Sequence, residues 1–101
     1  MASLKELQAK VAQTTVELGH SDDPKVVLLF LLEELGEVAR AFLKEEGFKK
    51  QNNRVLETAA QEMGDLFFML LRLAHVKGVD LEKQLDNTLT KLRRSHYQKE
   101  L

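Results

Sequence analysis

The chain has 101 residues, with 15 lysines and arginines against 16 aspartates and glutamates, for a formal net charge of −1. Acids and bases are interspersed, so the one-sided positive surface of a nucleic-acid-binding protein is missing. Because there is no cysteine, disulfides, thiolate zinc sites and a cysteine nucleophile are excluded together, and any metal must be bound by oxygen or imidazole ligands.

The N-terminal segment predicts an amphipathic helix from about Ser3 to Leu18, ended by Gly19. It lacks the apolar stretch of a signal peptide, and the longest apolar run, residues 26–32, is too short to span a bilayer. We therefore expect a soluble, cytoplasmic protein with a single domain over residues 1–101. The face of this helix expected in the core carries Leu4, Leu7, Val11, Thr14 and Leu18.

A second helix is predicted to begin at Pro24. Asp23 can cap it, and proline suits the first helical position because the donor it lacks would be unpaired there anyway. This helix should continue to about Glu46 and end at Gly47. The polar, turn-forming segment 47–53 that follows is expected to be the most mobile part of the chain.

Two more helices are predicted in the second half of the chain. Asn52 or Asn53 can cap a third helix over about residues 54–77, and Asp80 can cap a fourth. Four helices with short connections predict an all-α fold, a four-helix bundle. The stripe of the fourth helix that should be buried consists of Leu81, Leu85, Thr88 and Leu92.

The two central helices are more apolar than one face of a bundle requires. Apolar residues cover every side of the run VVLLFLL, and in LFFMLL the side chains of Phe68 and Leu71 point away from the face that carries Glu62. Helices that are apolar all round are usually buried all round. We infer that these helices also pack against another subunit; the alternative is that the outer helices of the same chain wrap them.

Four carboxylates lie on helix faces where core residues are expected. At about 100° per residue, Glu34 and Glu37 share the apolar stripe of the second helix, and Glu62 and Asp65 share that of the third. Carboxylates are rarely buried unless they are paired or bind a metal. The two stripes are completed by Val27, Phe30, Val38 and Ala41 and by Leu66, Met69, Leu73 and Val76.

The i, i+3 spacing of each pair puts both acids within reach of one divalent cation. If the two helices pack side by side, magnesium would relieve the repulsion among the four acids, since an unpaired buried charge costs several kcal/mol. The alternative is that the acids are solvated or paired along their own helix, for example Glu37 with Arg40. Two pairs on two stripes favour the metal site. Glu33 lies off the stripe and is either a base or supporting group or simply exposed.

The run Glu33-Glu34-Leu35-Gly36-Glu37, followed by Glu62-Met63-Gly64-Asp65, resembles the EExxE and ExxD motifs of the MazG-like, all-α nucleoside triphosphate pyrophosphohydrolase superfamily. The flanking sequences LLEELGEVARA, EMGDLFFMLLRLA and GVDLEKQL resemble it in order and register over about residues 29–94. The resemblance implies a magnesium-dependent helical module, usually a dimer or a dimer of dimers. It would hydrolyse a nucleoside or deoxynucleoside triphosphate to the monophosphate and pyrophosphate, with clearance of non-standard nucleotides as one use.

The same resemblance implies a role for each motif residue. Glu34, Glu37, Glu62 and Asp65 would bind Mg²⁺, or Mn²⁺ in its place, and Glu33 would be the additional acid, our first choice as proton acceptor from the attacking water. Family members also use donors late in the chain to bind the phosphates. Candidates here share one helix edge, although a solvated basic face is the alternative: Asn87, Lys91 and Arg94.

Two questions stay open at this point. Family members often place an aromatic residue near the first helix to stack on the base, but this chain has no Trp and one Tyr, Tyr97, which leaves Phe30, Phe42, Phe48 and His20. Phosphoribosyl-ATP pyrophosphohydrolases share the acids but tend to have a His at the position of Met69, so that activity is the weaker alternative within the family. The alternative outside it is a non-catalytic helical homodimer that binds a metal or a regulatory partner.

Overall fold

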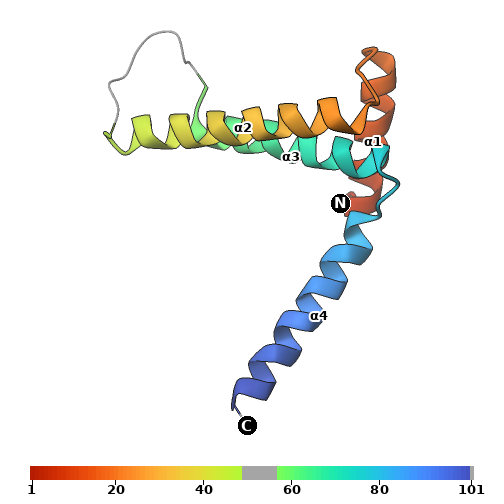
Figure 1. Ribbon diagram of the computed structural model, residues 1–101, viewed down its shortest axis with the longest axis vertical. Coiled ribbons are helices and arrows are strands. Elements are labelled where there is room, and N and C mark those ends of the chain that lie inside the picture. The colour runs from red at the N-terminus through yellow and green to blue at the C-terminus, as the bar shows by residue number, and fades with distance from the viewer. Residues whose placement is uncertain (49–56, 101) are drawn as a thin grey trace.

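The computed structural model describes residues 1–48 and 57–100, with side chains as far as residue 96. The regular structure of these residues is helical throughout (Figure 1): α1 (Leu4–Glu17), α2 (Pro24–Glu45), α3 (Ala59–Val76) and α4 (Leu81–Glu100). The all-α, four-helix prediction is confirmed. None of the described helices is long and apolar enough to cross a membrane.

The first two helices begin at residues that satisfy their free backbone donors. The Ser3 hydroxyl accepts from the backbone N of Glu6 at 3.1 Å while the Glu6 carboxylate accepts from the backbone N of Ser3, which makes a capping box. Asp23 caps α2 as predicted and accepts from the backbone N of Lys25 at 2.9 Å. Gly19 follows α1 with a φ of 68°, a conformation that strains any residue with a Cβ.

The third helix begins at Ala59, later than the predicted start at Arg54. The reason is a second capping box: the Thr58 hydroxyl accepts from the backbone N of Gln61 at 3.2 Å, and the Gln61 side chain accepts from the backbone N of Thr58 at 2.8 Å. Thr58 is therefore the cap. The candidate caps Asn52 and Asn53, and most of the segment expected to be mobile, lie outside the described residues.

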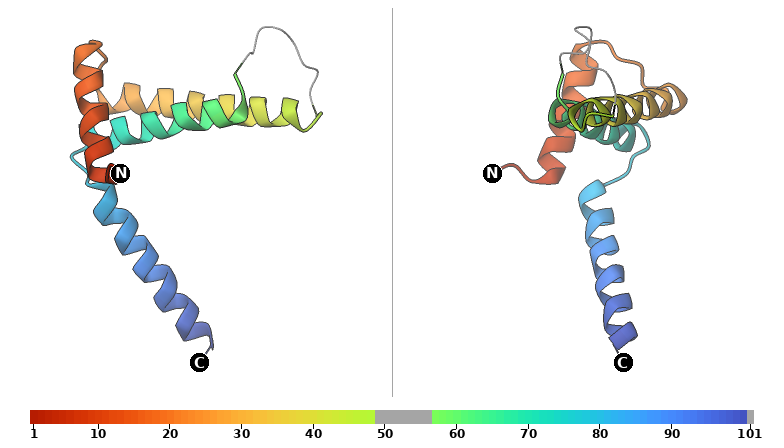
Figure 2. Two further views of the ribbon diagram at one scale, coloured as in Figure 1. Left: turned by 180° about the vertical axis from the view of Figure 1, so that it is seen from behind. Right: turned by 90° about the vertical axis from the view of Figure 1, so that its left-hand side faces the viewer.

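The core lies between α2 and α3, which run antiparallel and side by side, with α1 across one end of the pair (Figures 1 and 2). Small residues let the helices approach closely, and three of the six buried apolar positions among the described residues are alanines. They are Val27 and Ala41 on α2, and Ala59, Met69, Leu71 and Ala74 on α3.

Several core predictions were wrong, among them Leu7 and Leu18 on the predicted core face of α1, which are 36% and 64% exposed. Phe30 on α2 is 46% exposed. In α1 the buried residue is Thr15 rather than Thr14, and the Thr15 hydroxyl donates to the carbonyl oxygen of Ala12 at 2.8 Å. The internal hydrogen bond is what makes a threonine acceptable at that position.

A buried arginine ties the connection between α1 and α2 to α3. Arg72 is 6% exposed, its Nη2 donates to the carbonyl oxygen of Ser21 at 2.8 Å, and its Nη1 contacts Met69 Sδ at 3.8 Å. The start of α2 is thereby held beside the last turns of α3. This fixes how the two central helices align along their length.

The direction of α4 is set from α1. Gln8 Nε2 donates to the carbonyl oxygen of Val79 at 2.6 Å, and Gln8 Oε1 accepts from the backbone N of Leu81 at 3.3 Å. Asp80 caps the helix as predicted, accepting from the backbone N of Lys83 at 3.2 Å. The side chain of one α1 residue thus holds the turn from which α4 starts.

From that turn α4 extends away from the α2–α3 pair (Figures 1 and 2). Within one chain the four helices therefore do not close into a bundle. The predicted buried stripe of α4 is correspondingly uncovered, with Leu85 50% and Leu92 57% exposed. The periodicity of the sequence predicts that α4 has an apolar face, but it does not predict which element covers that face.

Candidate metal centre

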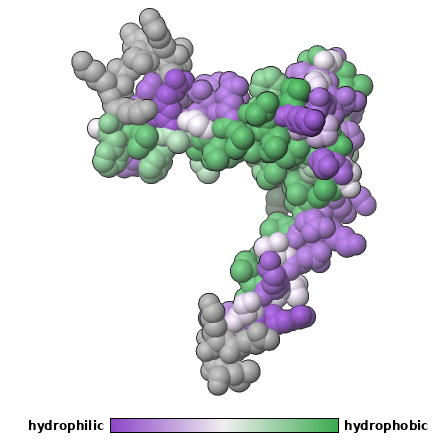
Figure 3. All heavy atoms as spheres, in the orientation of Figure 1, coloured by the Kyte–Doolittle hydropathy of each residue, from purple (hydrophilic) through white to green (hydrophobic). Residues whose placement is uncertain are grey.

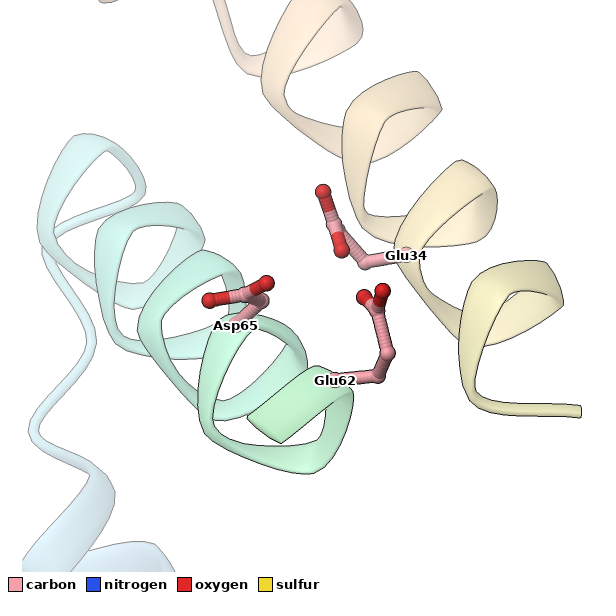
Figure 4. A group of neighbouring side chains, drawn as sticks. All are labelled: Glu34, Glu62 and Asp65. Atoms are coloured by element: carbon pink, nitrogen blue, oxygen red, sulfur yellow. The ribbon is translucent and has the colours of Figure 1, made fainter. Parts of the chain in front are cut away.

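The packing of α2 against α3 brings together one acid from the first motif and two from the second. Glu34 reaches from α2, and Glu62 and Asp65, one turn apart on α3, reach from the opposite side into the same gap (Figure 4). One carboxylate oxygen from each of the three lies within 4.8 Å of the others. Three of the four predicted ligands therefore converge.

The group of three acids is closed on one side and open on the other. Glu62 is only 5% exposed, Glu34 is half-buried and Asp65 is exposed. A carboxylate as buried as Glu62 normally has a cationic partner. Within the described part of the chain, however, no lysine or arginine forms an ion pair with any of the three.

The uncompensated charge is reflected in the protonation of these groups. Burial, followed by interaction with the carboxyl of Glu57, raises the pKa of Glu62 from 4.5 to about 7. Burial, and then the charges of Asp65, Glu33, Glu37 and Glu57, raise the pKa of Glu34. The pKa of Asp65 is raised as well, by burial and then by Glu57. None of the described residues supplies the centre with a positive charge that would keep it ionised.

The donor set fits a hard divalent cation. All three groups supply oxygen, the spacing matches ligands of one small ion, and the open side leaves room for water or phosphate oxygens. Magnesium characteristically takes a few carboxylates and completes its coordination with water and substrate phosphates. The residues present can therefore hold such an ion.

Two acids of the first motif lie apart from this group. Glu37 Oε2 accepts from Arg40 Nη2 at 2.8 Å, the i, i+3 pairing that was the alternative for this residue. Glu33 is exposed, and its charge is among those that raise the pKa of Glu34, its neighbour in the chain. Neither residue belongs to the cluster of three.

One acid was missed by sequence reasoning. Glu57 immediately precedes the cap of α3, and its interaction with Glu62 and Asp65 is among the causes that raise the pKa of each. It stands outside both motifs and outside the predicted apolar stripe. The capping-box pattern of Thr58 and Gln61 was the local signal that places this residue just before the helix.

The predicted phosphate donors do not meet the acids within one chain. Asn87, Lys91 and Arg94 are exposed on α4, which extends away from the α2–α3 pair that carries the three carboxylates (Figure 1). No contact between these donors and the acidic centre exists in the described chain. Their role remains a prediction.

The candidates for contact with the base are also distributed over the molecule. The three phenylalanines among them are exposed, and His20 makes an edge-on contact with Phe68, with ring centroids 6.4 Å apart and planes at 85°. Met69, at the position where the phosphoribosyl-ATP branch tends to have a histidine, is buried against Arg72.

Comparison with known proteins agrees with the motif. A family model described as the MazG nucleotide pyrophosphohydrolase domain matches residues 22–99. A solved structure of YPJD from Bacillus subtilis, described as a candidate pyrophosphatase, is 27% identical with a TM-score of 0.76, and the match covers 91% of this chain and 94% of that one. The structure of iMazG from Vibrio DAT 722 is 26% identical with a TM-score of 0.65, over 89% of this chain and 99% of that one. Comparison with curated proteins gave no match.

Proposed function

The chain belongs to the MazG family of nucleotide pyrophosphohydrolases, and from this premise we propose that it hydrolyses a nucleoside or deoxynucleoside triphosphate to the monophosphate and pyrophosphate with Mg²⁺ as cofactor. The observation that carries the proposal is the convergence of Glu34, Glu62 and Asp65 across the α2–α3 gap. Mn²⁺, with the same preference for oxygen ligands, is expected to substitute.

The three carboxylates would hold the cation at the closed side of the centre and leave its open side to the triphosphate. A bound divalent ion supplies charge neutralisation of the phosphate oxygens and lowers the pKa of water. Phosphoryl transfer needs little else from the protein except alignment of the reactants. The paired elements α2 and α3 are suited to that, because helices joined through a packed core hold side chains more rigidly than loops do.

Glu33 is proposed to accept the proton of the attacking water. In the overall reaction, water adds its oxygen to the phosphorus that ends in the monophosphate, the phosphoanhydride bond breaks, and pyrophosphate leaves with that electron pair. Glu33 is exposed and adjacent to Glu34, so it can take the water's proton without being a ligand. Asn87, Lys91 and Arg94 are proposed to bind the phosphates.

We further propose that the functional unit is a homo-oligomer. Large apolar side chains are exposed on both central helices, for example Leu29 at 66% and Met63 at 58%. Hydrophobic atoms also gather on the side of α4 that faces the α2–α3 arm (Figure 3). Apolar faces of this extent are usually covered by a partner. Association would also allow the donors on one chain's α4 to approach the acids of another.

The test is a panel of ribo- and deoxyribonucleoside triphosphates, including non-standard bases and phosphoribosyl-ATP, incubated with protein and Mg²⁺. Pyrophosphate as the first product supports the proposal, and Glu62→Gln should abolish its release. Orthophosphate as the first product would identify a different reaction. No product from any nucleotide would favour the non-catalytic helical homodimer.

A further inference from the structure

A hydrogen bond from the last residue of α2 joins this helix to the first turn of α3. The carboxylate of Glu45 accepts from the backbone N of Ala59 at 2.8 Å. Ala59 is 8% exposed, and the backbone donors in the first turn of a helix have no acceptor within the helix itself. Glu45 therefore satisfies a buried donor that α3 cannot satisfy from its own turns.

The capping box of α3 makes contacts of a different kind. The Thr58 hydroxyl accepts from the backbone N of Gln61, and the Gln61 side chain accepts from the backbone N of Thr58, so both hydrogen bonds lie within the start of α3. They hold the first turn together without connecting it to α2. The contact from Glu45, by contrast, connects the two helices.

The turn that Glu45 contacts carries one of the converging acids. Glu62 lies in the first turn of α3 and is 5% exposed, and its carboxylate meets that of Glu34, which reaches from α2 (Figure 4). On α2, Glu45 follows Glu34 by about three turns, which leaves the two side chains only about 20° apart around the helix. The face of α2 that supplies Glu34 is therefore also the face that holds the first turn of α3.

Apolar packing alone does little to fix how far the two helices slide along each other. Hydrophobic burial is non-directional, and the buried alanines Ala41 and Ala59 have no long side chains to interlock. A hydrogen bond has a defined distance and direction. Because oxygen–metal distances are restricted to about ±0.2 Å, a small slide of α3 along α2 would take Glu62 out of reach of an ion bound by Glu34.

A second contact holds the opposite end of the helix pair. Arg72 Nη2, near the end of α3, donates to the carbonyl oxygen of Ser21, shortly before α2 begins. The three acids lie between this contact and the one from Glu45. Arg72, however, is about two turns beyond Asp65, whereas Glu45 acts on the turn that contains Glu62.

We propose that Glu45 is a positioning residue of the metal centre: its hydrogen bond to Ala59 holds Glu62 at the distance from Glu34 that a divalent ion requires. Glu45 lies outside the group of three acids and outside both motifs, so it acts through Glu62 and not as a ligand. The inference rests on the proposed function in assuming that the centre binds a divalent ion.

The experiment is a titration of the full-length chain with Mn²⁺ in the absence of nucleotide, with free Mn²⁺ measured by electron paramagnetic resonance. Two neutral variants of similar length separate the hydrogen bond from the charge. Glu45→Gln keeps an oxygen that accepts from the backbone N of Ala59, whereas Glu45→Met places a methyl group there. Glu46→Met, at the exposed end of α2, is the matched control.

Glu45→Met should raise the Kd for Mn²⁺ at least about tenfold, because loss of a group that orients a metal ligand costs 10- to 100-fold in affinity. Glu45→Gln should stay within about threefold of the wild type, and Glu46→Met should leave the Kd unchanged. Circular dichroism of each metal-free variant checks that it is folded. If Glu45→Met does not fold, Glu45→Ala is titrated in its place with the same expectation.

A Kd for Glu45→Met within about twofold of the wild-type value overturns the inference and leaves the hydrogen bond as a stabilising contact. An equal weakening by Glu45→Gln also overturns it, because the charge of Glu45 would then be responsible. The same holds for an equal weakening by Glu46→Met, which would indicate a general effect of changing the end of α2.

The proposed function fails in a way that can be told apart. If the wild type binds Mn²⁺ but releases no pyrophosphate from any nucleotide, the proposed reaction is wrong, while the effect of Glu45→Met on the Kd still stands. If the wild type does not bind Mn²⁺, the metal centre and the role of Glu45 are both overturned.

Discussion

Replacing Glu62 with glutamine removes one charge from the acidic centre while keeping the shape of the side chain. In the metal-free protein this should stabilise the fold, contrary to the usual effect of changing a buried residue. The sign follows from the raised pKa. The folded state binds the Glu62 proton more tightly than the unfolded chain does, so the free energy of unfolding falls as pH rises from about 4.5 to about 7 and is level above that.

The magnitude can be worked from the same values. One pKa unit corresponds to about 1.4 kcal/mol, so the rise from 4.5 to about 7 sets an upper limit of about 3 kcal/mol at pH 8. Water reaches the centre beside the exposed Asp65 and screens part of this. We expect Glu62→Gln to raise the free energy of unfolding by about 1–2 kcal/mol, or the Tm by about 5–10 °C.

The assay is thermal unfolding followed by circular dichroism in a metal chelator, at several pH values between 4.5 and 8. Protein concentration is kept constant, because association changes the Tm. Asp86→Asn, which removes an exposed acid on α4, controls for the change in net charge. The reasoning is refuted if Glu62→Gln lowers the Tm at pH 8. It is also refuted if the substitution raises the Tm by the same amount at pH 4.5 as at pH 8.

Four further outcomes are expected. At pH 8, Mg²⁺ at 100 times its Kd should raise the free energy of unfolding of the wild type by about 2.7 kcal/mol. The effect should be smaller at pH 5, because protons compete with the metal for the carboxylates. A Tm that Mg²⁺ leaves unchanged at both pH values would exclude a metal site. Thr58→Ala should lower the free energy of unfolding, measured with urea, by about 1 kcal/mol, whereas Thr58→Ser should stay close to the wild type. Equal stability of Thr58→Ala and the wild type would contradict the capping box. Val27→Ala should cost about 2 kcal/mol, because Val27 is 0% exposed; a negligible loss would contradict that packing. Lys91→Ala and Arg94→Ala should each raise the KM for the triphosphate about tenfold and leave the affinity for Mn²⁺ unchanged. If the KM does not change, these two residues do not bind the phosphates.

The elements of the fold could be predicted because their signals are local. The cap of α2 at Asp23 and that of α4 at Asp80 follow from residue type and position alone. The start of α3 has an equally local signal, the capping-box pattern of Thr58 and Gln61. It was overlooked because Asn52 and Asn53 are also good capping residues. The direction of α4 has no such signal, because it depends on a hydrogen bond from Gln8 to residues far along the chain.

The candidate site likewise has some residues that the sequence predicts and others that it does not. Helix periodicity placed Glu34, Glu62 and Asp65 on facing stripes, and their convergence follows once α2 and α3 pack together. Periodicity could not decide whether Glu37 faces the centre or Arg40, since both lie within reach of one helix face. Glu57 precedes α3, although the predicted third helix included its position, and it lies outside the apolar stripe of that helix.

The contact made by Gln8 has a consequence for how related chains could diverge. Residues 22–99 match the family model, whereas α1, which carries Gln8, precedes that region. The turn before α4 is therefore held in part by a residue that precedes the stretch matching the family model. The contact that positions the start of α4 and the acids of the centre are therefore supplied by different parts of the chain.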